Sequence, residues 1–518
     1  MIAQSASASL SGVIQDEQEA LIRGVKHTLR DSSKGLTREL SSDGNGAYTF
    51  AKLPPSTYEL LVESPGFAKA RFEEIILNAN DQRALRVKLK LAQRDESVTV
   101  NDETPLVSES PAVATSVDQK FIENQLLNGR SFQSLIALSP GVQLTSSSLV
   151  DQGQFSVNGQ RTATNNFTVD GVSANFGTPF ATTPYETGGA VPTLSAQGGT
   201  SALASVDAVQ EFTIQTSTYS PEYGRQPGAQ IAIVTRSGSN TLHGTAFDYF
   251  RNDKLDGNSW FGNVNGLHRP ALRRPALRQN DFGFTFGGPV LIPKLYNGRN
   301  KTFFFSSYEG LRLIQPVISV PSRVPLNTAR QQATGVVKAL LEAYPLPVAA
   351  PLADAPLETP YITSFSNRSK LDATSFRIDH SFSSRLTLFG RYNYAASENV
   401  ERGRFATPSF LTLLPARSET VTVGITLIAS PTFTNDLRFN WSKSRRSQIY
   451  TQDTFGGAKL LPRELHLPEF AKPETTLYYL AIGGNDENTI SPGTFSDNTQ
   501  QQYNVINTSS WNLGAHTV

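Results

Sequence analysis

The sequence predicts a mainly β protein in which a small N-terminal β-sandwich, a mixed α/β domain and part of an antiparallel transmembrane β-barrel follow one another. Three observations support this prediction. Short alternating segments separated by turn residues fill residues 10–92, polar glycine- and threonine-rich segments fill 106–236, and aromatic segments of period two fill 237–518. Residues 93–105 are expected to be a linker, and residues 1–9 to be the remnant of a signal or cleavage region.

The composition excludes several classes of protein. The 46 basic and 45 acidic residues nearly cancel, so no net charge favours nucleic acid as a partner. The chain has no cysteine, which excludes disulfides, iron–sulfur clusters and thiol catalysis. No run approaches the roughly 20 apolar residues of a membrane-spanning helix. The alternating strands of a membrane barrel would not produce such a run.

The first unit, residues 10–92, consists of short alternating segments that predict a β-sandwich. In its last segment one face carries Leu85, Val87, Leu89 and Leu91. The tetrapeptide Asp43-Gly44-Asn45-Gly46 could begin a calcium loop, but such a loop needs further oxygen ligands and a bidentate glutamate. A strand follows it immediately. We therefore expect a hairpin turn here and no metal site.

The linker, residues 93–105, is polar and contains a pentapeptide that is able to form a strand. This pentapeptide consists of Glu96, Ser97, Val98, Thr99 and Val100. Two interpretations are open. It completes the sandwich, or it stays free to add as a strand to the sheet edge of a partner protein.

The next unit, residues 106–236, contains the ordered but chemically inert segment VNGQRTATNNFTVDGV, residues 157–172. This segment has no histidine and no cysteine, and its one carboxylate belongs to Asp170 in an Asp-Gly turn. One or two short amphipathic helices are expected before it, ending at Ser139-Pro140-Gly141. A long glycine-, threonine- and proline-rich loop follows it, so the whole unit predicts a small α/β domain with long polar loops.

From residue 237 onward, aromatic strands alternate with long polar segments. In the segment RLTLFGRYNYAAS one face carries Leu386, Leu388, Gly390, Tyr392 and Tyr394. The other face carries Arg385, Thr387, Arg391 and Asn393, together with Phe389. An apolar, aromatic face opposite a charged face, repeated from strand to strand, is typical of a barrel with lipid outside and water inside. A soluble sandwich or propeller is the alternative.

One motif invites an enzymatic interpretation. His466-Leu467-Pro468-Glu469 fits the H-x-x-E pair of zinc carboxypeptidases, but a zinc site needs a third ligand and a base. The only later histidine is His516, and the pair lies in a proline-rich segment. No G-x-S-x-G, H-E-x-x-H or P-loop motif is present. We therefore predict that the protein is not an enzyme, with no catalytic residue, metal site or cofactor.

Two groups of segments resemble known families. SGVIQDEQEALIRGVKHTLRD and SSDGNGAYTFAKLPPSTYELLVESPGF resemble the carboxypeptidase regulatory-like domain, a transthyretin-like sandwich with a carbohydrate-binding-like fold, although Ser56-Thr57 stands where the family usually has Pro-Gly. The following segments, in this order, resemble TonB-dependent outer-membrane receptors of the Oar-like kind. They are LNGRSFQSLIALSPGV, FSVNGQRTATNNFTVDGV, VDAVQEFTIQTSTYSPEYGRQPGAQIAIVTRSGSN, TLHGTAFDYFRND and DFGFTFGGPV.

The second resemblance implies a location and two kinds of site. It implies the outer membrane of a Gram-negative-type bacterium, with the N-terminal domain in the periplasm. It also implies that residues 106–236 are a plug inside the barrel, and that Glu96–Val100 is the energy-coupling peptide that pairs with TonB by strand addition. The plug residues expected to face the barrel lumen or a substrate are Asn158, Gln160, Arg161, Asn165, Asn166 and Asp170.

The function implied by the resemblance is uptake of a bulky substrate through TonB, with carbohydrate, peptide and chelate as open substrate classes. TonB and outer-membrane lipid would be the partners. The alternative is adhesion or carbohydrate binding at the outer membrane without transport. Aromatic candidates for sugar contact in the sandwich are Tyr48, Phe50, Tyr58 and Phe67, although their alternation places most of them in the core. Transporters of this class close about 22 strands into a barrel, so we expect the chain to be a fragment of a longer protein.

Overall fold

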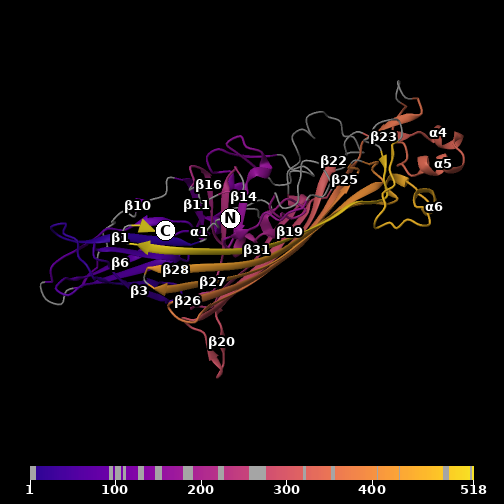
Figure 1. Cartoon of the computed structure of the whole chain (residues 1–518). Helices are drawn as coiled ribbons and strands as arrows, with labels where there is room; N and C mark the ends of the chain where they lie inside the picture. Colours follow the sequence, from indigo (N-terminus) through magenta and orange to yellow (C-terminus); the bar gives the residue numbers. More distant parts are fainter. Residues whose placement is uncertain are drawn as a thin grey trace.

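The computed structural model arranges the chain as three units along one long axis (Figure 1). A β-sandwich lies at one end, a mixed α/β unit lies in the middle, and a large sheet runs from the sandwich, past the middle unit, to a group of short helices. No helix in the described part of the chain has the length and apolar character needed to cross a membrane. The described residues are 7–92, 97–99, 107–108, 112–125, 133–145, 155–178, 191–219, 224, 227–255, 276–318, 322–351, 356–404, 406–430, 432–481, 489–513 and 516–517.

The N-terminal unit is a sandwich of two five-stranded sheets. One sheet contains β1 (Ala8–Asp16), β4 (Ala47–Leu53), β7 (Gln82–Ala84), β8 (Val87–Leu89) and β10 (Val107–Ser108). The other has the order β3 (Thr37–Ser41), β2 (Lys26–Asp31), β5 (Ser56–Glu63), β6 (Lys69–Leu77) and β9 (Ser97–Thr99). Leu85, Val87 and Leu89 are buried as predicted, but Leu91 is 62% exposed because β8 ends two residues before it.

The turn at residues 43–46 corrects one prediction. It does not close a hairpin, because β3 pairs with β2 in one sheet and β4 pairs with β1 in the other. It carries the chain from sheet to sheet, and the Oδ1 atom of Asp43 accepts hydrogen bonds from the backbone N–H groups of Asn45 and Ala47 at 2.8 Å each. The carboxylate therefore serves to order the turn.

The middle unit combines a five-stranded sheet with short helices around an apolar core. Its strand order is β11 (Val113–Asp118), β16 (Val209–Ser217), β17 (Gln230–Thr235), β14 (Asn166–Val169) and β15 (Val172–Ser173). The two predicted helices are present as α1 (Gln119–Asn124) and α2 (Gln133–Ile136), and the side chain of Asp118 caps α1. A separate hairpin joins β12 (Val142–Leu144) to β13 (Phe155–Val157). The 3-10 helices are η2 (Thr162–Thr164), η3 (Thr200–Ala202) and η4 (Val206–Ala208).

The third unit is an antiparallel sheet of long strands in sequence order. They are β18 (His243–Asn252), β19 (Arg278–Pro289), β22 (Thr302–Ile318), β25 (Ser364–Ser381), β26 (Leu386–Arg402), β27 (Phe410–Ser430), β28 (Phe433–Gln452) and β31 (Gly493–Leu513), with the short β32 (His516–Thr517) at the end. Within the described residues β18 and β31 do not pair with each other, so the sheet is an open, barrel-like wall.

The connections at the two ends of this wall differ in length. At the end that carries the sandwich, the connections are residues 382–385 and residues 290–301, which form a hairpin of β20 (Leu291–Ile292) and β21 (Tyr296–Asn297). At the opposite end the connections are long and carry β23 (Ser322–Pro325), α4 (Asn327–Gln332), α5 (Gly335–Glu342), β24 (Glu358–Tyr361), η7 (Phe455–Gly457), α6 (Arg463–His466), β29 (Leu480–Ala481) and β30 (Thr489–Ile490). Buried side chains such as Tyr344, Phe410 and Ile490 pack these connections into one apolar cluster.

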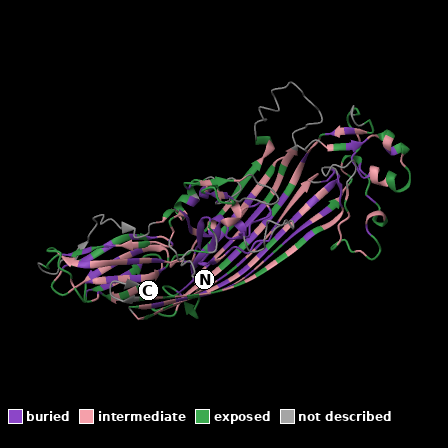
Figure 2. Ribbon diagram, turned by 45° about the horizontal axis from the view of Figure 1, so that its top comes forward, coloured by how far each residue is buried: buried purple, intermediate pink, exposed green. Residues whose placement is uncertain are grey.

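The two faces of the wall have opposite character, as the alternation in residues 385–397 predicts. The middle unit covers one face, which we call the inner face, and there Arg391 and Asn393 of β26 are only 4% and 2% exposed (Figure 2). On the other, outer face, Tyr392 of β26 and Phe376 of β25 are 38% and 44% exposed. Polar side chains therefore meet the middle unit and aromatic side chains face outward, which is the arrangement of a membrane barrel wall.

Candidate functional site

The middle unit contacts the inner face of the wall through a buried ionic cluster centred on Asp170. Asp170 and Gly171 form the tight turn between β14 and β15, with φ of 49° and 77°. Asp-Gly is favoured in such turns because both positions need positive φ. Asp170 is 3% exposed, and its Oδ1 atom accepts hydrogen bonds from the backbone N–H and the hydroxyl of Thr235, both at 3.0 Å.

Three arginines from the wall converge on this turn. The Nη1 atom of Arg377 (β25) lies 3.1 Å from Oδ1 of Asp170, and Nη1 of Arg391 (β26) lies 3.9 Å from its Oδ2. Arg438 (β28) donates a hydrogen bond to the backbone carbonyl of Asp170. Buried charges are stable only when they are paired and hydrogen-bonded, so the wall helps to position this turn of the middle unit.

Two further carboxylates complete the cluster. Arg377 forms a two-pronged contact with Asp379, at 2.8 Å and 2.9 Å, and its guanidinium lies 4.5 Å from the ring centre of Phe389. Arg438 pairs with Asp436 at 2.8 Å. Three guanidinium groups thus face three carboxylates, so the cluster carries no net charge.

A second contact between the middle unit and the wall lies at the end of η3. The carbonyl of Ala202 accepts hydrogen bonds from Asn393 at 3.1 Å and Ser418 at 3.3 Å. The carbonyl of Leu203 accepts one from Arg391 at 2.8 Å. Side chains of the wall therefore bind backbone atoms of the middle unit, and this mode of contact depends little on which side chains the middle unit carries.

Further polar contacts continue along the wall. The hydroxyl of Ser397 accepts a hydrogen bond from the backbone N–H of Ala196 at 2.8 Å, and Gln197 donates to the carbonyls of Lys370 and Glu398 at 3.2 Å and 3.1 Å. Water can replace hydrogen bonds at modest net cost, whereas separating a large apolar surface costs free energy in proportion to its area. The apolar contact that accompanies these polar contacts includes Ala202 of the middle unit with Leu311 and Ala395 of the wall.

The predicted plug residues separate into three groups in the structure. Asp170 faces the wall. Asn165 and Asn166 are buried within the middle unit, where Asn165 donates to the carbonyl of Phe155 at 2.7 Å and Asn166 donates to Gln230 at 2.9 Å. These two asparagines hold strands of the unit together. This explains why residues 157–172 are highly ordered although they contain no histidine and no cysteine.

The other predicted plug residues lie in an exposed turn. They are Asn158, Gln160 and Arg161. Asn158 has a φ of 50° and donates a hydrogen bond to the carbonyl of Thr216 at 2.9 Å, so it holds the turn. Gln160 and Arg161 are exposed to solvent. Sequence analysis did not identify Arg377 and Arg438 as site residues, although both occupy inner-face positions in alternating strands.

The predicted coupling peptide lies partly within the described residues. Ser97–Thr99 form β9, which pairs in parallel with β6 at the edge of the sandwich, with Ser97 opposite Lys69 and Thr99 opposite Arg71. Glu96 and Val100 lie outside the described residues. The three central residues thus complete a sheet of the sandwich in this conformation, in agreement with the first of the two interpretations left open by the sequence.

A buried carboxyl group connects the sandwich to the middle unit. Glu211 of β16 is 4% exposed and accepts a hydrogen bond from the backbone N–H of Ala79 in the sandwich. Burial raises the pKa of Glu211 to about 8; the hydrogen bond from Ala79 opposes this rise, and the charges of Asp81 and Asp118 add to it. The contact is therefore neutral at pH 7.

The H-x-x-E pair has no metal-binding surroundings. The ring of His466 packs edge-on against Tyr478, with ring centres 6.2 Å apart, and its Nδ1 atom lies 2.9 Å from the carbonyl of Pro462. Throughout the described residues there is no group of three histidine, cysteine or acidic side chains that could hold a metal ion. In the sandwich the aromatic candidates Tyr48, Phe50 and Tyr58 are at most 4% exposed, so they form core and not a platform for sugar.

Three family models match consecutive parts of this chain. Residues 9–90 match the carboxypeptidase regulatory-like domain, residues 107–229 match the TonB-dependent receptor plug domain, and residues 234–518 match the outer membrane beta barrel domain. The last match alone covers more than half of the chain. The chain belongs to the TonB-dependent outer-membrane receptors. The middle unit is accordingly the plug of this receptor, the long sheet is barrel wall, and the location is the outer membrane of Gram-negative bacteria.

Several named proteins are similar to parts of this chain. The receptor is 30% identical to the TonB-dependent transporter Oar of Myxococcus xanthus over 286 residues, which is 53% of this chain and 24% of that protein. Among solved structures, the outer membrane transporter YddB from Escherichia coli matches 80% of this chain and 46% of its own, at 13% identity and a TM-score of 0.49. The ferric enterobactin receptor from Pseudomonas aeruginosa matches 78% of this chain and 47% of its own, at 12% identity and a TM-score of 0.43. The chain thus spans less than half the length of these proteins.

Proposed function

We propose that this receptor imports a bulky substrate across the outer membrane, with energy delivered through TonB to the plug. The observation that carries the proposal is the polar contact between plug and wall around Asp170. A plug that must move and return needs an interface of reversible hydrogen bonds and ion pairs, and the contacts of Asp170, Ala202 and Leu203 are of this kind.

The energy would enter through Glu96–Val100. Strand addition suits a pulling partner, because backbone hydrogen bonds carry the load and make few demands on side chains. The pairing of Ser97–Thr99 with β6 covers only three residue pairs. TonB would have to displace this short strand, and the small number of hydrogen bonds lost keeps the cost of displacement low.

A binding experiment with the periplasmic domain of TonB tests this proposal. The full chain, purified in detergent, should bind that domain. Val98→Pro removes a backbone N–H and should weaken binding by about tenfold, as expected for roughly 1.4 kcal/mol, whereas Val98→Ala keeps the backbone donor and should bind within about twofold of wild type. A wild-type chain that does not bind TonB would contradict the coupling, and equal binding by Val98→Pro would contradict strand addition.

The alternative, adhesion or carbohydrate binding without transport, predicts a different result. Glycans would then bind to the full chain while TonB would not. The buried positions of Tyr48, Phe50 and Tyr58 give no support to a sugar platform on the sandwich. We therefore favour transport, and carbohydrate, peptide and chelate remain open as substrate classes.

A further inference from the structure

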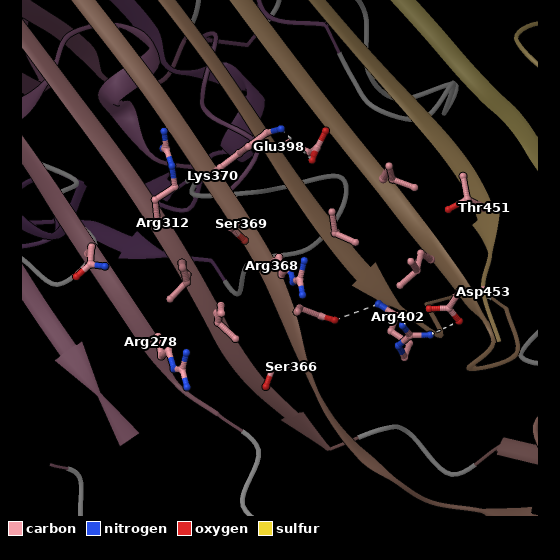
Figure 3. Close-up of a pocket in the computed structure, with 17 residues that line it drawn as sticks. Arg278, Arg312, Ser366, Arg368, Ser369, Lys370, Glu398, Arg402, Thr451 and Asp453 are labelled. Atoms are coloured by element: carbon pink, nitrogen blue, oxygen red, sulfur yellow. Dashed lines mark hydrogen bonds and ion pairs between the residues drawn. The ribbon is translucent and has the colours of Figure 1, made fainter. Parts of the chain in front are cut away.

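A groove on the outer face of the wall carries an excess of positive charge. It has a volume of about 780 Å³ and lies near the ends of β22, β25 and β26 that lead into the long connections (Figure 3). Its charged lining residues are Arg278, Arg312, Arg368, Lys370, Arg402, Glu398 and Asp453. Positive side chains on a surface that faces lipid need an explanation, because the outer face of a barrel is otherwise apolar.

The strand register places these charges on the side away from the plug. Arg312 lies opposite Lys370, and Lys370 lies opposite Glu398, across β22, β25 and β26. Their chain neighbours Leu311 and Leu371 are buried in a cluster with Ala202 of the plug. Successive side chains of a strand point to opposite faces, so these charged side chains lie on the face away from the plug contact described above.

Among the described residues, two of the arginines in the groove have no carboxylate partner. The ion pairs in and beside the groove are Arg402–Asp453 at 2.5 Å, Lys370–Glu398 at 3.4 Å and Arg312–Asp372 at 2.8 Å. Arg278 and Arg368 are exposed, and neither forms an ion pair within the described part of the chain. Both lie directly opposite Ile314, one on each side, so their Cα atoms are separated by two strand spacings, or about 10 Å.

Aliphatic side chains continue the row that contains these two arginines. Arg368 lies opposite Val400, and Val400 lies opposite Leu413 on the next strand. The row therefore alternates cation, Ile314, cation and then two aliphatic residues. Such a surface matches a ligand that carries anionic groups and hydrocarbon together, and a small soluble anion would leave the aliphatic part uncovered.

The position of the groove along the strands agrees with a lipid headgroup. Outward-facing aromatic residues of β28, namely Phe433, Phe439 and Trp441, span eight residues or about 27 Å of strand. Tyr308 of β22 lies in one row across the strands with Phe284 and Tyr394. It precedes Arg312 by four residues, or about 13 Å. The groove thus lies just beyond the aromatic row, on the side of the long connections, which in such barrels is the cell exterior.

We propose that this groove binds the phosphate groups of a phosphorylated glycolipid in the outer leaflet, held by Arg278 and Arg368, with Ile314 and Val400 against its hydrocarbon. Arginine suits this task because its planar guanidinium donates two parallel hydrogen bonds to a phosphate. The proposal rests on the family and its membrane orientation. It is independent of TonB and of the imported substrate.

Native mass spectrometry of the full chain in detergent tests the proposal with defined lipids. Diphosphorylated lipid A should remain bound, and the fully dephosphorylated lipid should bind at least about tenfold more weakly. This comparison needs no variant. The double variant Arg278→Gln/Arg368→Gln should lose about tenfold in affinity for the diphosphorylated lipid. Arg417→Gln, which removes an exposed outward-facing cation outside the groove, should stay within about twofold of wild type.

Three results would overturn the proposal. Equal binding of the phosphorylated and dephosphorylated lipids would show that phosphate is not recognised. Displacement of the lipid by millimolar inorganic phosphate would show a site for free anions. An unchanged affinity in the double variant, with the folded barrel confirmed by its resistance to detergent at room temperature, would show that the lipid binds elsewhere.

Discussion

The Nη1 atom of Arg377 lies 3.1 Å from Oδ1 of Asp170 and 3.0 Å from Oγ1 of Thr235, so one guanidinium group on the barrel wall holds two segments of the plug. Asp170 closes the turn after β14, and Thr235 ends β17, the strand next to it in the plug sheet. Because these two strands pair in parallel, their ends lie at the same edge of that sheet. The wall therefore recognises an edge of the folded plug, and an unfolded plug would not present it.

Asp170→Asn should loosen the plug. Arg377 keeps Asp379 and Arg438 keeps Asp436, but Arg391 loses its nearby carboxylate. Breaking a buried pair from one side costs about 3 kcal/mol, so the plug should become accessible to protease at a lower urea concentration. Asp248→Asn, on an exposed position of β18, is the control and should behave as wild type. Identical urea profiles for both variants would show that the cluster does not hold the plug.

Gly424→Ala should disturb the same cluster indirectly. A Cβ atom at Gly424 would clash with the ring of Phe389, the ring on which Arg377 is stacked. The ring has to shift, and overpacking of this kind costs about 1–3 kcal/mol. Gly390→Ala on the neighbouring strand is the matched control, because a Cβ atom there meets no atom within 4 Å. The same urea assay should separate the two variants, and equal effects would contradict the role of Phe389.

The contact between sandwich and plug should weaken as the pH rises. The pKa of Glu211 is raised to about 8 in the folded protein, above its value of about 4.3 in an unfolded chain. Between these two pH values the folded state binds one more proton than the unfolded state. The free energy of unfolding therefore falls as the pH increases from about 4.5 to 8. Amide exchange of Ala79, corrected for the intrinsic rate, should therefore show less protection at pH 8 than at pH 6.

Glu211→Gln provides the decisive comparison for that prediction. Glutamine keeps an oxygen acceptor for the Ala79 N–H and has no charge, so protection should no longer depend on pH in this range. Glu17→Gln, at an exposed position of the sandwich, should retain the wild-type dependence. A pH dependence that persists in Glu211→Gln would assign it to another group.

The sandwich itself should lose stability in acid through His27. This histidine is fully buried, donates from Nδ1 to the carbonyl of Val25 at 2.9 Å and stacks on Tyr48 with ring centres 4.4 Å apart. Burial lowers the pKa of His27 to about 4, and the hydrogen bond to Val25 opposes the shift. The stabilisation is complete when the pH is above about 6.5, the pKa of histidine in an unfolded chain, and it is lost as the pH falls toward 4.

Hydrogen exchange in β2 and β4 measures this loss directly. Wild type should open more readily at pH 5 than at pH 7, after correction for intrinsic rates. His27→Phe keeps a stacking ring without a titratable group and should show no such difference, although it lacks the donor to Val25 and is less stable throughout. His466→Phe, in the external connections, should leave the pH response of the sandwich unchanged. A pH response retained in His27→Phe would contradict the assignment.

The sequence was informative wherever a pattern is local. The alternation in residues 385–397 predicted the two faces of β26, and the turn residues of 10–92 predicted a sandwich. It failed where partners are distant in the chain. The turn at Asp43 was expected to close a hairpin, because nothing local shows that β3 and β4 belong to different sheets.

The candidate site shows the same limit. Asp170 was selected from its polar segment, but so were Asn165 and Asn166, whose partners Phe155 and Gln230 lie inside the plug. Local sequence does not distinguish a polar side chain that orders a loop from one that contacts a wall more than 200 residues away. Alternation places Arg377 on the inner face of its strand, but only the fold brings it to Asp170.

Movement of the plug away from the wall is the central claim, and one introduced thiol tests it most directly. The chain has no cysteine, so Ala202→Cys would be its only thiol, at a site 3% exposed between plug and wall. In living cells a membrane-impermeant thiol reagent should label it faster when TonB is present and energised than when TonB is deleted, while Lys120→Cys on the exposed surface of the plug should label equally in both. Equal, slow labelling of Ala202→Cys in both strains would contradict a plug that TonB displaces.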